Sequence, residues 1–392
     1  MKNNPGLDRF MLTIAMFFAG TVLSEVFVNI YIWKLNSDME LIIIYSLACY
    51  ITIPIIFYLC GYIGMRIDRV KLYIAGIFFY AMFYLSVLLL REKVTSHLVL
   101  IGVIKGFAMG LYWFGYHILT MDYTEHGKRD SFYGKVSVIS GSVSMAGPFL
   151  SGLVIHLMPG LRGYYVIFGV TSALLLVAAV LITPLKSRPI KKPYKIEDLI
   201  FTRNKKWLRT MIAFFFLSGK DAIMMFLMAV LVVRATGSEF TFGKYAMLVS
   251  GLGILTSYLL SKHSNPDTRK EFALVGAIAG FLASSLLVFN TSFPVLILYG
   301  ALSVVSDYLV RIPFSAYSMD LISIDAAAGE RKMEYIAARD VPIALGRIFS
   351  LVLFMFLLRR IDLTAIKVIV PLISAFPFAI YWAMCNKKTA KA

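Results

Sequence analysis

The sequence predicts an all-α integral membrane protein, with about twelve transmembrane helices arranged in two pseudo-symmetric bundles of about six helices each. Of its 392 residues, 59% are hydrophobic and only 16% are charged, whereas a soluble protein carries about a quarter charged residues. Apolar runs long enough to cross a bilayer recur along the whole chain, with most Lys and Arg residues between them. Because lipid offers the backbone no hydrogen-bond partner, runs of this kind must be helical.

The apolar runs give the predicted helices in order, on the criterion that a span needs about twenty mostly apolar residues. We expect the first run to be a retained helix and not a signal peptide, because no small-residue cleavage site follows it. The first half contains spans near residues 9–33, 40–64, 72–90, 96–121, 132–157 and 162–184. The second half contains spans near residues 207–234, 240–261, 271–289, 293–321, 339–358 and 364–384.

Basic residues set the predicted orientation of these spans. The formal net charge is +17, and Lys and Arg in one set of alternating loops outnumber those in the other set, which includes Lys34, by about three to one. The positive-inside rule therefore places both termini and the longest loop in the cytoplasm. Short loops favour the plasma (inner) membrane of a bacterium. Since topology accounts for the charge, we expect no nucleic-acid partner.

The longest loop divides the chain into three predicted parts. Residues 1–184 form an N-terminal six-helix bundle, residues 185–206 a basic cytoplasmic linker, and residues 207–392 a C-terminal six-helix bundle with a cytoplasmic tail. Pro184, Pro189 and Pro193 prevent a helix from continuing through the start of the linker.

The two halves carry a weak internal repeat. Each half has a Met-Asp dipeptide at the end of a helix, followed by a Gly-x-Arg-x-x-x-Tyr pattern that enters the next helix. The repeat consists of Met121-Asp122 with Gly127, Arg129 and Tyr133, and of Met319-Asp320 with Gly329, Arg331 and Tyr335. Its position is the one expected for a duplicated six-helix unit.

The span count, the basic central loop and the similar halves resemble the major facilitator superfamily along essentially the whole chain. The loop between the second and third spans also resembles the family pattern Gly-x-x-x-Asp-Arg-x-Gly-Arg-x-Lys. Gly61, Arg66, Arg69 and Lys71 match it, Met65 replaces the aspartate, and Asp68 replaces the second glycine. The resemblance implies that this loop gates the cytoplasmic side. Alternatively, its cations act only as topology determinants.

Two further stretches resemble family patterns in part. In the fourth span, Lys105 replaces the family glutamine, and Gly102, Gly106 and Gly110 form a stripe suited to tight helix packing.

In the fifth span, Gly147-Pro148 and Gly152 match the core of the family's antiporter pattern. A Gly-Pro pair inside a span predicts a kink, and the resemblance favours export over uptake. The alternative is a packing kink without a role in direction.

Charged residues at bilayer depth are the main functional candidates, because burying them costs at least a few kcal/mol. They are Glu25, Lys105, Lys220, Asp221, Asp307, Arg311 and Arg347. The resemblance implies that the first, fourth, seventh and tenth spans line a central cavity. All of these charges except Arg347 lie on those spans.

The predicted roles follow from charge and position. Glu25 is the first candidate for proton coupling, because a carboxyl group in an apolar site takes up a proton readily; Asp221 and Asp307 are the others. Asp307 and Arg311, one helical turn apart, are candidates for simple mutual neutralisation. The adjacent Lys220 and Asp221 point in different directions and need separate partners. The predicted substrate-cavity residues are Lys105, Tyr112, Trp113, Lys220, Arg311 and Arg347.

These features predict a secondary active transporter that exports a small organic molecule by proton-coupled alternating access. Proton-driven nutrient uptake and a lipid or glycolipid flippase are the alternatives. We expect an anionic or amphipathic substrate, protons and the lipid bilayer as partners, and a functional monomer. We do not expect the protein to be an enzyme, and we expect it to have no cofactor and no metal site. The sequence shows no paired catalytic carboxylates, no Ser/His arrangement, no metal-ligand spacing and no nucleotide-binding loop.

Overall fold

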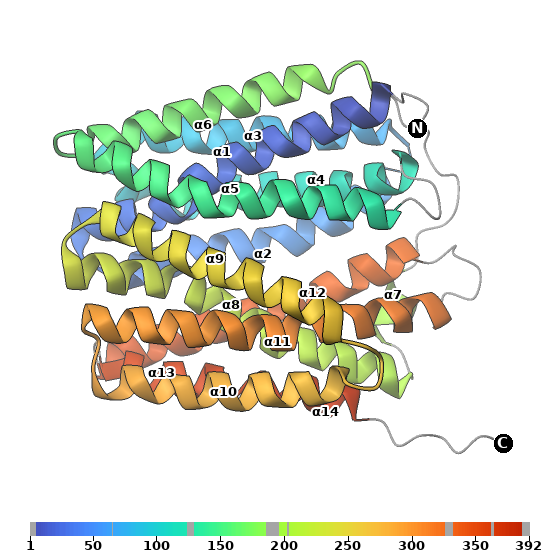
Figure 1. The fold of residues 1–392 in the computed structure, drawn as a ribbon. Helices are drawn as coiled ribbons and strands as arrows, with labels where there is room; N and C mark the ends of the chain where they lie inside the picture. Colours follow the sequence, from blue (N-terminus) through green and yellow to red (C-terminus); the bar gives the residue numbers. More distant parts are fainter. Residues whose placement is uncertain are drawn as a thin grey trace. The chain divides into compact units, whose positions relative to one another are not determined.

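The computed structural model describes residues 5–64, 66–123, 129–185, 196–201, 204–325, 332–361 and 364–385. Every regular element in these ranges is a helix, which confirms the predicted all-α class (Figure 1). Some residues of the sequence arguments lie outside the described ranges. They are Met65, Gly127, Pro189, Pro193, Gly329 and Arg331.

The first half of the chain contains the helices α1 to α6. They are α1 (Pro5–Asn36), α2 (Met39–Ile63), α3 (Arg69–Leu90), the 3-10 helix η1 (Arg91–His97), α4 (Leu98–Tyr123), α5 (Arg129–Leu157) and α6 (Arg162–Leu181). Aspartates cap two of these helices: Asp38 accepts a hydrogen bond from the Glu40 N–H, and Asp68 accepts one from the Val70 N–H. Each side chain thereby satisfies one of the free N–H groups of a first helical turn.

The second half contains α7 (Glu197–Ile200), α8 (Lys205–Thr236), α9 (Glu239–His263), α10 (Arg269–Phe289), α11 (Phe293–Asp325), α12 (Lys332–Ile361), α13 (Ala365–Ser374) and α14 (Phe378–Met384). The last predicted span, 364–384, is therefore two helices. The break falls just before Pro377, the N-cap of α14. A proline ring clashes with the carbonyl group four residues earlier and offers no N–H to continue the helix.

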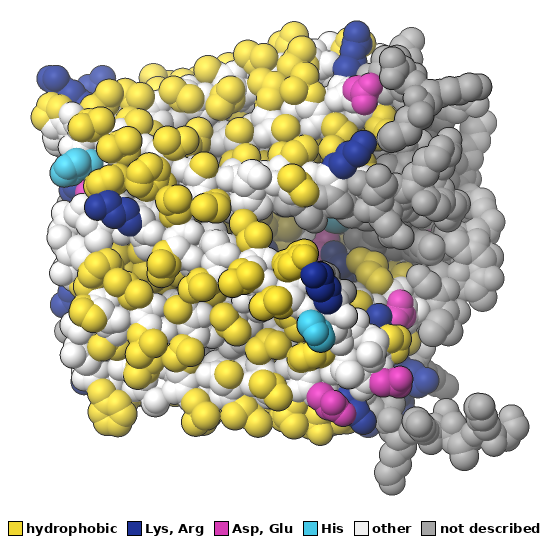
Figure 2. All heavy atoms as spheres, in the orientation of Figure 1, with side chains coloured by type: hydrophobic (Ala, Val, Ile, Leu, Met, Phe, Trp, Pro, Cys, Tyr) yellow, Lys and Arg dark blue, Asp and Glu magenta, His cyan; other side chains and the backbone are white. Residues whose placement is uncertain are grey.

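Within the described residues, ten segments are long and apolar enough to cross a membrane. One of them, Arg69–Thr120, runs through α3, η1 and α4 together, and α9 is not among the ten. The result is consistent with the predicted count of about twelve spans. Figure 2 shows hydrophobic side chains spread over the middle of the helices and most Lys and Arg side chains towards their ends. This distribution is that of a multi-pass membrane protein.

The chain forms two compact units. The first comprises Met1–Tyr194 with Gly237–Met247, and the second comprises Lys195–Thr236 with Leu248–Ala392. Helix α9 is thus shared, because its first residues pack with the first unit and the remainder with the second. The predicted domain boundaries at residues 184 and 207 stay a prediction.

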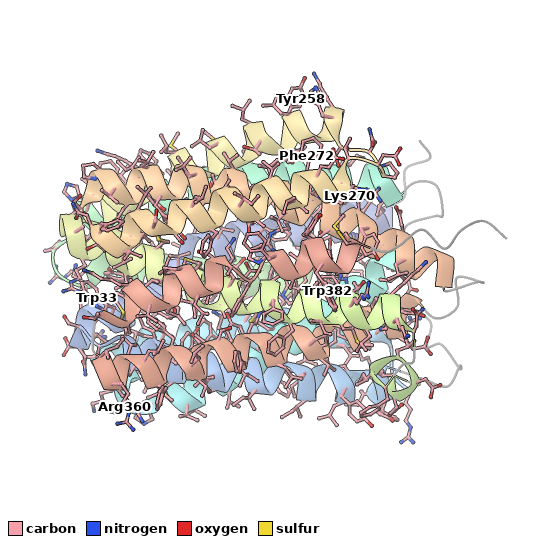
Figure 3. The ribbon with its side chains drawn as sticks, turned by 90° about the horizontal axis from the view of Figure 1, so that it is seen from below. Trp33, Tyr258, Lys270, Phe272, Arg360 and Trp382 are labelled. Atoms are coloured by element: carbon pink, nitrogen blue, oxygen red, sulfur yellow. The ribbon has the colours of Figure 1, made fainter. Side chains whose placement is uncertain are left out.

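Each unit has its own helix packing. In the first unit, α2 and α3 pack on α4, and α1 packs on α5 and α6. In the second, α8 packs on α12, and α10 packs on α11 and α13. Figure 3 shows Arg360 at one end of the second unit, and Lys270 and Trp382 towards the other end.

The predicted glycine stripe of α4 faces α2. A Cβ atom at Gly102 would overlap the carbonyl oxygen of Tyr45, and one at Gly106 would overlap that of Cys49. At Gly110 it would come within 2.7 Å of an α2 side chain. The tight packing predicted for the stripe is therefore confirmed, and it fixes the distance between α2 and the candidate site on α4.

Candidate functional site

The first unit holds an ion pair between α1 and α4. The Nζ atom of Lys105 lies 3.1 Å from Oε1 of Glu25. The Lys105 side chain is 6% exposed and the Glu25 side chain 23% exposed. The same Nζ lies 5.3 Å from the centroid of the Tyr45 ring and 5.6 Å from that of the Phe83 ring. Aromatic faces and a carboxylate therefore surround the ammonium group, and only the carboxylate is accessible to any extent.

The two aromatic cavity candidates on α4 differ in environment. Tyr112 is fully buried and stacks on Phe17 with a centroid distance of 3.5 Å. Trp113 is partly buried and makes an edge contact with Tyr116 at 5.5 Å. Trp113 thus keeps access to the space beside α4, whereas Tyr112 forms part of the helix-packing core.

The second unit holds a cluster of four charges between α8 and α11, which we call the α8–α11 cluster: Lys220, Asp221, Asp307 and Arg311. Lys220 Nζ lies 3.2 Å from Asp307 Oδ1. The Arg311 guanidinium donates from Nε to Asp307 at 2.9 Å, and from Nη2 and Nη1 to Asp221 at 2.8 and 3.2 Å. Lys220 and Asp221 therefore have separate partners, as predicted, and Arg311 bridges two carboxylates.

Exposure is graded across this cluster. Asp221 and Arg311 have side chains 34% and 39% exposed, whereas the Lys220 side chain is 8% exposed. Two cations and two carboxylates make the cluster electrically neutral. Lys220 is therefore the buried member, Asp307 is 24% exposed, and Asp221 and Arg311 form the most exposed pair, near the middle of α8 and α11.

Arg347, the remaining cavity candidate, lies on α12 and is partly buried. Its charge and that of Arg339 both act on the carboxylate of Asp340. The spacing of Asp340 and Arg347, two helical turns apart on one face, was the signal that could have related them.

Arginine–aspartate pairs join the helix ends of the internal repeat. Arg69 of α3 lies 3.4 Å from Asp122 of α4, and Arg269 of α10 lies 2.6 Å from Asp320 of α11. Both aspartates belong to the Met-Asp dipeptides of the repeat. The two halves therefore share an Arg–Asp ion pair as well as the sequence pattern.

Among the other residues of the predicted gating loop, Gly61 is buried, and Arg66 and Lys71 are exposed. Asp68 caps α3 through the Val70 N–H.

At the opposite helix ends, a buried carboxylate that the sequence analysis missed joins three helices. Glu239 accepts hydrogen bonds from Lys34 Nζ at 2.5 Å and from the Tyr164 hydroxyl at 2.7 Å. Glu239 is the first residue of α9, just outside the predicted span 240–261. Burial alone would disfavour its charge, but the hydrogen bonds from Lys34 and Tyr164 outweigh burial and hold the pKa of Glu239 below its ordinary value.

The Gly147-Pro148 segment of α5, where a kink is predicted, lies near this same end of α9. Pro148 sits inside the continuous helix α5. A Cβ atom at Gly152 would come within 2.6 Å of the Glu239 carbonyl oxygen, and one at Gly243 within 2.6 Å of the Pro148 carbonyl oxygen. Gly147 instead approaches the side chain of Val22 on α1. The glycines of this region therefore permit close backbone crossings.

The sequence of this chain is similar to those of known proteins. The family model described as Major Facilitator Superfamily matches residues 9–329. The "Uncharacterized protein YqgE" of Bacillus subtilis (strain 168) is 35% identical over 355 residues, which are 90% of this chain and 82% of that protein.

Among solved structures, a bacterial homologue of the iron transporter ferroportin in an inward-facing state matches with a TM-score of 0.75 and 11% identity, covering 98% of this chain and 100% of that chain. The fucose:proton symporter of E. coli matches with a TM-score of 0.64 and 15% identity, covering 98% of this chain and 100% of that one. At these identities the likeness shows the fold.

Proposed function

This chain belongs to the Major Facilitator Superfamily, and we propose that it is a proton-coupled secondary transporter that exports a small organic molecule across the bacterial plasma membrane. Alternating access of the two helix bundles is the mechanism of the proposal, with both termini in the cytoplasm. The observation that carries the proposal is the ion pair of Glu25 and Lys105.

Glu25 has the properties that a proton-coupling carboxylate needs. It lies well inside α1, where an ionisable group is costly unless it has a function. It is accessible enough to exchange a proton, whereas Lys105 is sealed. When Glu25 is protonated, the ring faces of Tyr45 and Phe83 still stabilise the Lys105 ammonium group. The two rings thus offset part of the cost of neutralising the Glu25 carboxylate.

The accessible part of the α8–α11 cluster supports a polar substrate. Arg311 and Asp221 remain reachable near the middle of their helices, and charges at that depth do not face lipid. The direction of transport rests on the Gly147-Pro148 and Gly152 pattern of α5, which resembles that of family antiporters. Proton-driven uptake and lipid flipping are outcomes that the experiment distinguishes.

The experiment uses everted membrane vesicles in which respiration acidifies the lumen and a quenched acridine dye reports the pH gradient. Pools of organic anions, cations and zwitterions are added to the medium, which is the cytoplasmic side of these vesicles. We expect one pool to relieve the quenching in the wild type, because the exchanged protons leave the lumen. Glu25→Gln should abolish the response, and Glu271→Gln, at an exposed carboxylate of α10, should retain it.

Other outcomes contradict parts of the proposal. A response that requires the compound to be loaded inside the lumen indicates symport, which overturns export. A response that survives in Glu25→Gln but disappears in Asp221→Asn or Asp307→Asn moves the coupling site to the second unit. Flipping of a labelled lipid without proton movement by any pool supports the flippase alternative.

A further inference from the structure

The α8–α11 cluster contains an ion pair that the proton-coupling role of Glu25 does not use. We infer that the accessible pair of Asp221 and Arg311 binds the substrate and selects a zwitterion, a molecule with one cationic and one anionic group. This inference rests on the proposed function, because it names the substrate class of the proposed transporter. It replaces the net anion expected from the sequence with a zwitterion, which still carries an anionic group.

Access from outside differs between the members of the cluster. Lys220 is buried and forms an ion pair with Asp307. Asp307 also accepts a hydrogen bond of 2.9 Å from Nε of Arg311. The contact with Asp307 holds the Arg311 guanidinium in place. Nη1 and Nη2 of Arg311 donate to Asp221, and Nη2 also donates to Asp307 at 3.2 Å. The side chains of Asp221 and Arg311 are both more than one-third exposed. A ligand therefore reaches Asp221 and Arg311 first.

The pair of Asp221 and Arg311 can open to a ligand without leaving a charge unpaired. The two Nη groups of Arg311 form a fork that a ligand carboxylate fits in the same two-point geometry as Asp221. A cationic group of the same ligand can then occupy Asp221. Arg311 stays anchored by Asp307 throughout, so the exchange replaces one internal pair with two pairs to the ligand.

The α8–α11 cluster has no net charge. Its two cations and two carboxylates cancel, so a ligand with a single charge would displace one partner and leave the other without compensation. An uncompensated charge in a partly buried site carries a large free-energy cost. A zwitterion avoids this cost because its own charges cancel. The geometry thus selects against net anions and net cations.

The test is ligand-dependent thermal stabilisation of the full-length protein in detergent. The probes are the standard amino acids, taurine and trimethylglycine. Each amino acid is compared with its amide, which keeps only the cation, and with its N-acetyl derivative, which keeps only the anion. We expect at least one zwitterion to raise the unfolding temperature. Its two derivatives should bind at least about tenfold more weakly than the zwitterion.

The Asp221→Asn variant gives a readout that a merely structural role would not move. It removes the carboxylate that takes the ligand cation but leaves Arg311 held by Asp307. We expect its preference to shift from the zwitterion to the N-acetyl derivative. Asp221→Glu should keep the zwitterion preference, and Glu271→Gln should behave like the wild type.

The inference is overturned if no zwitterion stabilises the wild type, if the derivatives stabilise it equally well, or if Asp221→Asn keeps the wild-type preference. The vesicle assay separates this result from the proposed function. A zwitterion that binds as expected but moves no protons contradicts proton coupling and leaves the inference in place. A singly charged compound that moves protons while zwitterions do not bind leaves the transporter in place and overturns the inference.

Discussion

Lys34, at the end of α1, donates a hydrogen bond of 2.5 Å to Glu239, at the start of α9. The contact ties the first turn of a helix shared by both compact units to the first unit. Tyr164 of α6 donates to the same carboxylate, so Glu239 has two donors and little exposure.

We expect this contact to make stability fall at acidic pH. The pKa of Glu239 in the folded protein lies below its ordinary value, which is about 4.3. A lowered pKa means that the stabilisation is complete above the ordinary value and is lost as pH falls through the folded value. The wild-type unfolding temperature should therefore drop more steeply than that of Glu239→Gln between about pH 5 and pH 3. Parallel curves for the two proteins would contradict this role.

The glycine stripe of α4 provides a second prediction. Gly106→Ala should lower the unfolding temperature, because the new Cβ overlaps the carbonyl oxygen of Cys49 and forces α2 and α4 apart. Overpacking of this kind costs about 1–3 kcal/mol. Gly251→Ala in α9 is the matched control, since nothing lies within 4 Å of its Cβ position, and the better helix propensity of alanine should leave stability equal or higher. Equal losses in both variants would show that the close approach is unimportant.

The pair of Glu25 and Lys105 should show energetic coupling. Glu25→Gln leaves the buried ammonium group of Lys105 without its carboxylate, which lowers the unfolding temperature, although the Tyr45 and Phe83 rings limit the loss. Lys105→Met combined with Glu25→Gln should recover most of that loss, because no buried charge remains. A double-mutant cycle measured by thermal unfolding checks this expectation. Additive losses would mean that the two side chains act independently.

The repeat-related pairs should differ in their response to salt. Arg69 is almost fully buried, whereas the side chain of Asp320, the partner of Arg269, is 57% exposed. We expect Arg69→Gln to cost about 2 kcal/mol at any salt concentration. Arg269→Gln should cost less than about 1 kcal/mol and become neutral in high salt, because salt screens exposed pairs. Unfolding temperatures at low and high salt provide the comparison, and equal salt sensitivity would contradict the assigned burial.

The helices could be predicted from the sequence because their signal is local: apolar length, basic loops and the Met-Asp repeat each lie within a short stretch of chain. The depth of Glu25, Lys105 and Asp307 followed from their position along a span. The ion pairs between different helices did not, because they depend on how each helix is rotated about its axis. The pair of Asp307 and Arg311 within α11 was visible in the sequence from its spacing of four residues. Lys220 and Asp221, as neighbours in sequence, revealed their need for separate partners but not which partners these are.

Other features depend on contacts between distant helices, which a single sequence does not encode visibly. Lys34 served only as a loop charge in the orientation argument, and its contact with Glu239 became apparent only in the fold. Tyr112 and Trp113 are adjacent aromatic residues, yet one is part of the core and the other is partly exposed. The break before Pro377 had a local signal in that proline, but the apolar run around it favoured one continuous span.

The neutrality of the ion-pair groups also bears on how the transporter responds to voltage. Glu25 and Lys105 cancel within the first unit, and the α8–α11 cluster cancels within the second. Moving one elementary charge across a membrane potential of 100 mV changes its free energy by about 2.3 kcal/mol. These groups carry no net charge while Glu25 is ionised. The membrane potential therefore does no work on them when the empty protein reorients. A proton on Glu25 would be the charge in these groups through which the potential drives the cycle.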